Sequence, residues 1–398
     1  MADGPLSGIR VIEIGQALAG PFAGVILAEM GAEVVKVEKP EGGDDARQWG
    51  PPFVEGDAVT FRALNRGKRS VTLDLKRAED VAALKALARD GADILIQNLR
   101  PGVAEALGIG PEALLAENPR LIYCSIWAFG HRGPLRDAPG FDPLLQAYGG
   151  VMTLTGRPED PPTFCAPPLN DKASAMWCVI GALAALQRRQ ATGRGGVIDT
   201  SLFEAAVSWV DTPLNQYAAT GRPPRRHGTA SAILVPYQVF ETADRPMVIA
   251  VGNDRLFAKC AEALGHPGWA RDPRFARGPD RAAHREALIA LMVPVLRART
   301  RAEWIARLAA AGVPCGPVND IPALAASEQL AAMDMMRRLP GSGMQVVGLP
   351  LSFERRRPHP RGDSPRLGEH TAEVLGRAGA RSGAPGGGSG APPPPGPT

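Results

Sequence analysis

The chain has 398 residues, 44% of them hydrophobic and 22% charged, which is the composition of a globular protein long enough for two domains. Its 45 basic and 41 acidic residues give a net charge of only +4, which argues against binding to nucleic acid or to a membrane surface. The N-terminal MADGPLSG lacks the regions of a signal peptide, and no apolar run reaches bilayer length. We therefore expect a cytoplasmic protein.

The first 200 residues alternate between β-rich runs and helical patterns. This alternation predicts a parallel sheet with helices on both faces, the α/β class. The expected strands cover residues 9–14, 34–37, 69–75, 94–96, 121–126 and 197–199, and the expected helices cover residues 22–30, 78–89 and 171–190.

A segment rich in Arg, Pro and Gly at residues 220–229 reads as a linker, and a different pattern follows it. Residues 235–240 and 247–251 predict a hairpin, and three amphipathic helices are expected at residues 255–264, 282–296 and 301–311. Residues 230–316 therefore predict a smaller α+β domain. The tail at residues 382–398 is low in complexity and is expected to be disordered.

The segment IEIGQALAGPFAG follows a strand and opens a helix, as a dinucleotide-binding fingerprint does. Glu38 lies near the end of the next expected strand, where a ribose-binding acid would be. Ala17, however, replaces the second glycine of G-x-G-x-x-G, which lets the backbone approach a pyrophosphate. NAD binding is therefore disfavoured, and a tight strand-to-helix turn accounts for the glycines.

The sequence contains no Walker A motif, G-x-S-x-G elbow, H-E-x-x-H motif or cluster of metal ligands. Its six histidines are scattered, so a serine or cysteine hydrolase would lack a visible base.

Asp171 opens the long helix expected at residues 171–190, and two interpretations of it stay open at the level of residues. An aspartate there is most often a helix cap, because its side chain accepts the free amides of the first turn. A helix N-terminus also stabilises an anion, so an ionised carboxylate able to attack an acyl carbonyl is the functional interpretation.

Several segments together resemble the family III CoA-transferases, the group of formyl-CoA:oxalate and carnitine CoA-transferases, from about Leu6 to Leu375. The order and spacing of these segments make the resemblance specific. They are GIRVIEIGQALAGPFAGVILAEMGAEVVKVEKP, LNRGKRSVTLDLK, ILIQNLRPGVAEALG, GFDPLLQAYGGVMTLTG, the Asp171 helix, AGVPCGPVND and PRLGEHT.

The resemblance implies a discontinuous large domain with a Rossmann-like parallel sheet, a smaller α+β domain and an interlocked homodimer. The large domain would comprise residues 1–219 and a return segment at residues 317–381. Asp171 would be the covalent nucleophile of an enzyme that moves CoA from an acyl-CoA donor, with succinyl-CoA as one candidate, to a free carboxylic acid. The covalent species would be mixed anhydrides and an aspartyl-CoA thioester, and CoA would be a substrate, with no permanently bound cofactor.

The resemblance also carries over the positions that bind CoA. Lys39 and Lys76 would meet phosphates as point charges, and the backbone around Asn98 would bind the adenine or pantetheine portion. The full set is Leu18, Ala19, Lys39, Leu73, Asp74, Leu75, Lys76, Asn98, Leu99, Arg100, Gly140, Phe141 and Asp142.

Two positions depart from the family pattern. Ala106 stands where many relatives have a phosphate-binding arginine, and Leu18 stands where formyl-CoA transferase has a glutamine. With the lack of a glycine-rich loop after the linker, these departures argue against oxalate and formyl-CoA as substrates.

A 2-methylacyl-CoA racemase of the same fold is the main alternative. Racemisation needs two bases on opposite faces of the α-carbon, and related racemases pair the aspartate with the histidine of a G-H-D segment. Here the segment is Gly140-Phe141-Asp142, and phenylalanine cannot move a proton. Transfer is therefore favoured over racemisation, while a non-catalytic CoA-binding homologue and a dehydrogenase are weaker alternatives.

Overall fold

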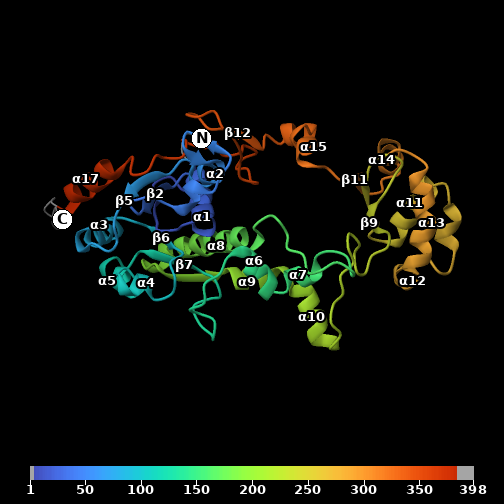
Figure 1. Cartoon of the computed structure of the whole chain (residues 1–398), viewed down its shortest axis with the longest axis horizontal. Coiled ribbons are helices and arrows are strands. Elements are labelled where there is room, and N and C mark those ends of the chain that lie inside the picture. Colours follow the sequence, from blue (N-terminus) through green and yellow to red (C-terminus); the bar gives the residue numbers. More distant parts are fainter. Residues whose placement is uncertain (1–3, 383–398) are drawn as a thin grey trace, which may run out of the picture. The chain divides into compact units, whose positions relative to one another are not determined.

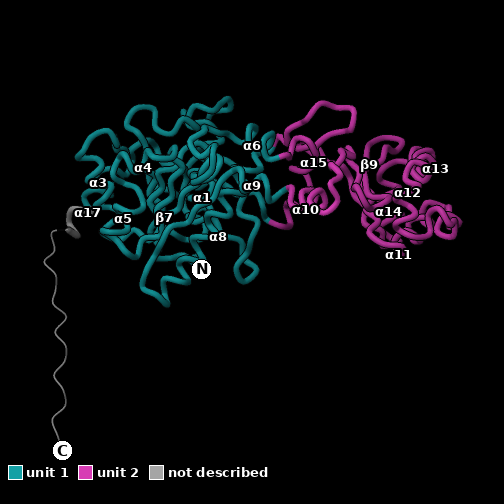
Figure 2. The backbone as a smooth tube through the Cα atoms, turned by 90° about the horizontal axis from the view of Figure 1, so that it is seen from below, with its two compact units in different colours: residues 1–149, 167–209, 334–398 teal, residues 150–166, 210–333 magenta. Residues whose placement is uncertain are grey.

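The computed structural model describes residues 4–382, which form two compact units. Unit 1 comprises residues up to 149, residues 167–209 and residues from 334 onward; unit 2 comprises residues 150–166 and 210–333 (Figure 2). Neither the predicted linker nor the predicted return point at 317 coincides with these boundaries. The expected disordered tail begins at Ser382, and its remaining residues lie outside the described part of the chain.

Unit 1 is built on a six-stranded sheet in which every paired strand is parallel. The strands are β1 (Arg10–Glu13), β2 (Glu33–Glu38), β5 (Arg69–Thr72), β6 (Ile94–Gln97), β7 (Ile122–Trp127) and β8 (Gly196–Ser201). Their order is β5-β2-β1-β6-β7-β8. From β1 the chain adds β2 and then β5 on one side of the sheet. It then returns to the other side of β1 and adds β6, β7 and β8 in turn. This order is that of the Rossmann fold, with its switch point between β1 and β6.

Each face of this sheet buries a separate apolar core, because successive side chains of a strand point to opposite faces. Val11, Ile94 and Ile122 pack on one face with α1 (Ala19–Glu29) and α8 (Leu169–Thr192). Ile12, Leu95 and Tyr123 pack on the other face with α3 (Ala78–Arg89), α4 (Val103–Ala106), α5 (Pro111–Glu117) and α17 (Thr371–Ser382) (Figure 1). The prediction of a parallel sheet covered by helices on both faces is confirmed.

Shorter elements of unit 1 surround the sheet. They are α2 (Val59–Asn65), α6 (Asp142–Tyr148), α9 (Leu202–Trp209), the 3-10 helix η1 (Asp45–Gln48), and the strand pairs β3 (Phe53–Val54) with β4 (Asp57–Ala58) and β12 (Met336–Arg338) with β13 (Gln345–Val347). At the start of α9, Ser201 Oγ accepts the Glu204 amide at 3.0 Å and donates to the Glu204 carboxylate at 2.7 Å. These two contacts cap the start of α9.

Unit 2 contains the three-stranded antiparallel sheet β11-β10-β9, with β9 (Tyr237–Phe240), β10 (Met247–Ala250) and β11 (Cys315–Pro317). The predicted hairpin is confirmed, and its core packs against the predicted helices. The helices of unit 2 are α7 (Val151–Leu154), α10 (Asp211–Thr220), α11 (Asp254–Ala263), η2 (Pro267–Arg271), α12 (Gly278–Ala283), α13 (Arg285–Arg297), α14 (Arg301–Ala310), α15 (Ile321–Ala325) and α16 (Glu328–Ala332).

The unit boundaries differ from the predicted ones for a physical reason. Gly228 donates its amide to the Gly156 carbonyl, and Arg226 donates to the Pro158 carbonyl, so residues 150–166 are held by unit 2. At the other end, β11 pairs with β10 and keeps the chain in unit 2 until residue 333. These contacts join segments that are far apart in the sequence, so no local pattern of hydrophobic residues indicates them.

The chain returns to unit 1 along the edge strand β5. The Thr72 amide donates to Thr371 Oγ1 at 3.0 Å, and the Gly368 amide donates to Ser70 Oγ at 2.9 Å. The segment PRLGEHT thus covers the edge of the sheet, where the backbone N–H and C=O groups of β5 would otherwise be unpaired.

Candidate functional site

A cavity of about 360 Å³ lies at the carboxyl ends of the strands of unit 1. Its wall includes the loops that follow β1 and β6, the two strands at the topological switch point. Open parallel sheets bind their ligands in this crevice, because the loops after the two strands diverge to opposite faces. The cavity is therefore the candidate active site.

Asn98 joins these two loops. Its side-chain Oδ1 accepts the Gln16 amide at 2.9 Å, and its Nδ2 donates to the Gln16 carbonyl at 2.9 Å. The Leu99 amide donates to the Gln97 side chain at 2.7 Å. These side-chain contacts hold the wall of the cavity in place.

The turn before α1 explains the glycine pattern. A Cβ on Gly15 would lie 2.8 Å from the Cα of Gly20, so the strand end and the helix approach too closely for larger residues. Ala17 has a φ of +66° and donates its amide to Asp44 Oδ1 at 3.0 Å. The interpretation of these glycines as a tight strand-to-helix turn agrees with this geometry.

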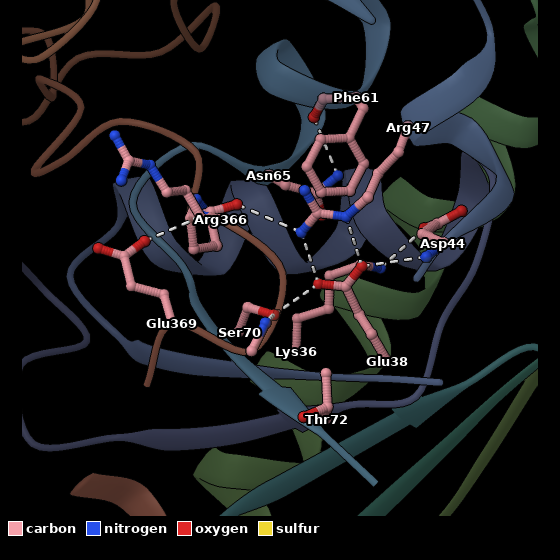
Figure 3. A network of polar contacts seen from close by, with 12 residues as sticks. Lys36, Glu38, Asp44, Arg47, Phe61, Asn65, Ser70, Thr72, Arg366 and Glu369 are labelled. Carbon is pink, nitrogen blue, oxygen red and sulfur yellow. Dashed lines mark hydrogen bonds and ion pairs between the residues drawn. The ribbon is translucent and has the colours of Figure 1, made fainter. Parts of the chain in front are cut away.

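The carboxylate of Glu38 already accepts hydrogen bonds from other side chains of the protein. Arg47 donates to both of its carboxylate oxygens at 2.8 Å, and Ser70 Oγ donates to it at 2.7 Å (Figure 3). Hydrogen bonds to Arg47 and the nearby positive charges lower the pKa of Glu38 in spite of its burial. A carboxylate held in this way is not available to a ribose, which adds to the argument against NAD.

Asp171 is the third residue of α8, and it lines the cavity. Among the described residues, no group donates a hydrogen bond to its carboxylate, and the helix begins at Leu169 without a side-chain cap from Pro168. Asp171 is therefore not the helix cap that the common interpretation of the sequence suggested.

The capping group comes from another helix. Asp142, the first residue of α6, is buried, and its Oδ2 accepts the amides of Asn170 at 2.6 Å and Asp171 at 3.1 Å. Gln146 Nε2 donates to the other oxygen at 2.5 Å. The carboxylate of Asp142 thus occupies the amide donors at the start of α8 that would otherwise stabilise the anion of Asp171.

Burial, and secondarily the negative charge of Asp142, raise the pKa of Asp171 to about 7. The functional interpretation of the sequence, in which the helix N-terminus stabilises the anion of this carboxylate, was wrong in direction, because the pKa lies above its ordinary value. A carboxyl group with a pKa near neutrality, placed in a cavity, is the kind of perturbed group that marks functional sites.

The structure places seven of the predicted CoA-binding positions in the cavity wall with Asp171. They are Leu18, Ala19, Asn98, Leu99, Arg100, Gly140 and Phe141. Phe141 is 69% exposed. No proton-transferring side chain therefore stands at this position of the wall.

The other predicted positions lie elsewhere. Lys39 is exposed and forms an ion pair with Asp45 at 2.6 Å. Leu73 is buried in the core, and the segment from Asp74 through Leu75 to Lys76 forms the turn after β5. Asp142 carries the cap of α8 instead of facing the cavity.

Sequence reasoning missed several residues of the cavity wall. Asp45 and Trp49 reach it from the segment around η1, and Trp127 reaches it from the end of β7. Trp127 lies at the carboxyl end of a predicted strand, which is a signal that could have identified it.

Neither a membrane span nor a metal-binding group is found within residues 4–382. No described helix is both long enough and apolar enough to cross a bilayer. No cluster of three or more described His, Cys, Asp or Glu side chains is arranged to hold a metal ion.

The fold and the cavity define an α/β protein with a candidate ligand site at the switch point of its sheet, and comparison with known proteins gives the family. The model of CoA-transferase family III matches residues 6–371. The chain belongs to CoA-transferase family III. This confirms the resemblance recognised in the sequence and the prediction that the chain is an enzyme, a CoA-transferase.

Curated relatives match over nearly the whole chain. An acetyl-CoA:oxalate CoA-transferase of Acetobacter aceti is 38% identical over 373 residues, covering 93% of this chain and 95% of the relative. A succinate–glutarate CoA-transferase of Agrobacterium fabrum is 38% identical over 387 residues, with the same coverage of both. The crystal structure of a CAIB/BAIF family protein from Brucella suis has a TM-score of 0.84 and 38% identity, covering 94% of this chain and 100% of that one.

Proposed function

We propose that this enzyme transfers CoA from an acyl-CoA donor to a free carboxylic acid through covalent intermediates on Asp171. The observation that supports this most is the position of Asp171, which lines the switch-point cavity and whose carboxylate has no hydrogen-bond partner among the described residues. A carboxylate engaged by a salt bridge or a cap would be a poor nucleophile, because its lone pairs would be occupied.

The proposed reaction begins when ionised Asp171 attacks the thioester carbonyl of the donor. The C–S bond breaks, CoA leaves as a thiolate, and a mixed anhydride joins the donor acyl group to Asp171. The thiolate then attacks the aspartyl carbonyl, which releases the donor acid as a carboxylate and leaves an aspartyl-CoA thioester. Covalent storage divides one difficult exchange into easier steps.

The second half repeats these steps in reverse order. The acceptor carboxylate attacks the aspartyl thioester and expels the thiolate, which forms a second anhydride. The thiolate attacks the acceptor carbonyl of this anhydride, so that acceptor acyl-CoA leaves and Asp171 is restored as a carboxylate. One thioester and one carboxylate enter and one of each leaves, so no ATP is needed.

The raised pKa of Asp171 fits the requirements of this cycle. With a pKa of about 7, a substantial fraction of the side chain is ionised at neutral pH. A carboxylate freed of strong hydrogen bonds and partly desolvated attacks a carbonyl more readily than a well-solvated one. The seven predicted CoA-binding positions in the same wall, among them Asn98 and Arg100, are proposed to hold the CoA portion.

The acceptor is proposed to be a dicarboxylic acid. Relatives that match over 93% or more of this chain are named for oxalate, glutarate and mesaconate, which are all dicarboxylic acids. Succinyl-CoA is the proposed donor, since the names of several relatives include it. Oxalate belongs in the test panel even though Leu18 and Ala106 argue against it.

A direct test combines transfer assays with trapping. The protein is incubated with succinyl-CoA and a panel of acids, and new acyl-CoA is measured by mass spectrometry. With a heavy-oxygen acceptor carboxylate, the mechanism requires the label to appear in Asp171, because the bridging oxygen of the second anhydride stays with the aspartate. Transfer that persists in Asp171→Ala, or an unlabelled Asp171 after turnover, would exclude the mechanism.

The racemase alternative is tested in the same samples. Solvent deuterium that enters the α-carbon of a 2-methylacyl-CoA, without transfer of CoA, would favour it. The exposed Phe141 supports transfer, because it places an aromatic ring in the cavity wall where a second base would be required.

A cytoplasmic homodimer is part of the proposal. On α8, the side chains of Met176, Trp177 and Ile180 are exposed at 40%, 51% and 53%, and their helical spacing places them on one apolar patch. Burial of this patch against a second copy would remove it from water. Light scattering on the purified protein is expected to give a dimer, and a monomer that is fully active would contradict this part of the proposal.

A further inference from the structure

Unit 2 contains a second cavity, of about 640 Å³, that is separate from the residues around Asp171. Its wall has an unusual charge composition. Arg225, Arg226 and Arg285 line it together with His227, and Glu286 is the acidic residue in the wall. Three guanidinium groups against one carboxylate give the cavity a positive potential.

Two of these arginines have N–H groups with no acceptor. Arg226 Nη2 donates to the Pro158 carbonyl at 3.1 Å, and Arg285 Nη2 donates to the Ser231 carbonyl at 2.7 Å. Within the described residues, the Nη1 atom of each arginine is buried and makes no hydrogen bond. The hydrogen bonds through Nη2 hold both guanidinium groups in place and leave the Nη1 atom of each without an acceptor.

A buried charged donor without an acceptor is costly, and such groups are rare in folded proteins. Arg226 and Arg285 each carry one such atom and line the same cavity, so an anion bound there would lie close to both guanidinium groups. Guanidinium groups match the oxygens of carboxylates and phosphates, which they bind through charge-assisted hydrogen bonds. The local electrostatics agree, since burial and the positive charges of Arg285 and Arg225 lower the pKa of His227.

We infer that this cavity of unit 2 is a binding site for an oxyanion, a carboxylate or phosphate group, held by the guanidinium groups of Arg226 and Arg285. The inference goes beyond the proposed function, because binding here does not require Asp171. Two sources offer this chemistry to a CoA-transferase: a phosphate of CoA and a carboxylate of a dicarboxylic acid.

The segment that precedes His227 offers a matched pair of variants. Arg222 and Arg225 are both exposed, and neither side chain makes a hydrogen bond or ion pair with the described residues, but only Arg225 lines the cavity. Arg225→Gln and Arg222→Gln change the net charge equally, and neither removes an internal contact. Arg226→Gln removes a guanidinium group that has an unpaired Nη1 donor. Arg285→Lys keeps the positive charge at its position but replaces the planar guanidinium with a single ammonium group.

The test measures binding to the full-length protein by calorimetry, with inorganic phosphate, succinate, CoA, dephospho-CoA and pantetheine as probes. Saturable binding of at least one anionic probe is expected. Arg226→Gln is expected to weaken it about tenfold or more, and Arg225→Gln by a smaller factor, whereas Arg222→Gln leaves it unchanged. Retained binding in Asp171→Asn separates this site from the proposed catalytic one.

The probes distinguish the two sources of the anion. Tighter binding of CoA than of dephospho-CoA, lost in Arg226→Gln, assigns a phosphate, while an Arg226-dependent site for succinate assigns a carboxylate. Two results would overturn the inference. One is the same affinity of every anion for the wild type, Arg225→Gln and Arg226→Gln; the other is an equal loss in Arg222→Gln, which would show a general charge effect.

Discussion

The Asp142 carboxylate accepts the backbone amide of Asp171 at 3.1 Å, and it accepts the amide of Asn170 at 2.6 Å with the same oxygen. Asp142 thereby caps α8, the helix that carries Asp171. This arrangement fixes the backbone of Asp171 and leaves its side chain free, and the charge of Asp142 raises the pKa of Asp171 in addition to the effect of burial.

Asp142→Asn is expected to shift the pH dependence of transfer. The substitution removes a negative charge beside Asp171, so the pKa of Asp171 falls and the acid limb of kcat/KM moves to lower pH. The weaker cap also reduces the free energy of unfolding by about 1 kcal/mol. Rate profiles against pH test this, with Asp137→Asn as the control, because Asp137 is exposed and pairs with Arg136. An acid limb that stays in place would contradict the role of Asp142.

The raised pKa of Asp171 also predicts how stability depends on pH. The folded-state pKa is about 7 and the ordinary value is 3.8, so between these values the folded state binds more protons than the unfolded state. The contribution of this group to stability is therefore complete below about pH 4 and is lost as the pH rises through 7.

Asp171→Asn removes this titration. The variant is expected to be more stable than the wild type at pH 8, by roughly 2–4 kcal/mol, and the difference is expected to shrink as the pH falls toward 4. Urea unfolding at a series of pH values measures it. A stability difference that does not change with pH would show that Asp171 does not titrate as the structure indicates.

The sheet of unit 1 was predictable because its strands are short apolar runs that alternate with helices. Residues 94–96, for example, coincide with most of β6 (Ile94–Gln97). The contact between Asp142 and Asp171 was not predictable, since it joins residues 29 apart and depends on how α6 packs against α8. Helix α10 was also missed, because it buries no residue and so has no apolar periodicity.

Among the residues of the candidate site, too, some features were predictable from the sequence and others were not. Asp171 and the loops after β1 and β6 were identified through the family resemblance, and the structure places them in one cavity. The ionisation of Asp171 was misjudged, because the sequence shows the helix N-terminus but not the buried acid that occupies its amides. Burial and tertiary contacts set pKa values, and neither is visible in a linear pattern.

The ion pair between Glu38 and Arg47 is expected to be important for stability. Their side chains are 1% and 4% exposed, and the guanidinium also stacks on Phe61 at 3.9 Å from the ring centroid (Figure 3). Arg47→Met leaves Glu38 buried without its partner, and the free energy of unfolding is expected to fall by about 3–5 kcal/mol.

Lys39 provides the control for this prediction. Its ion pair with Asp45 joins side chains that are 49% and 65% exposed, so Lys39→Met is expected to change stability by less than about 1 kcal/mol. Chemical denaturation of both variants makes the comparison. Equal losses in the two variants would contradict the special role of the buried pair.

Ala17→Gly restores the G-x-G-x-x-G pattern and tests whether the second glycine decides dinucleotide binding by this sheet. Ala17 has a φ of +66°, which is unfavourable for a residue with a Cβ, so the glycine variant is expected to be stabilised by up to about 1 kcal/mol. Gly15→Ala is the opposite control, since its Cβ would lie 2.8 Å from Gly20 and should destabilise the protein.

The same variant is expected not to acquire NAD binding. The acid that would receive the ribose, Glu38, remains bound by Arg47 and Ser70, and its lowered pKa reflects those contacts. Release of Glu38 would break a buried ion pair, at a cost that the ribose hydroxyls cannot recover. Fluorescence titration with NADH is therefore expected to show no saturable binding to Ala17→Gly. Saturable binding would show that the second glycine alone had prevented dinucleotide binding, and that the occupied state of Glu38 is not the barrier.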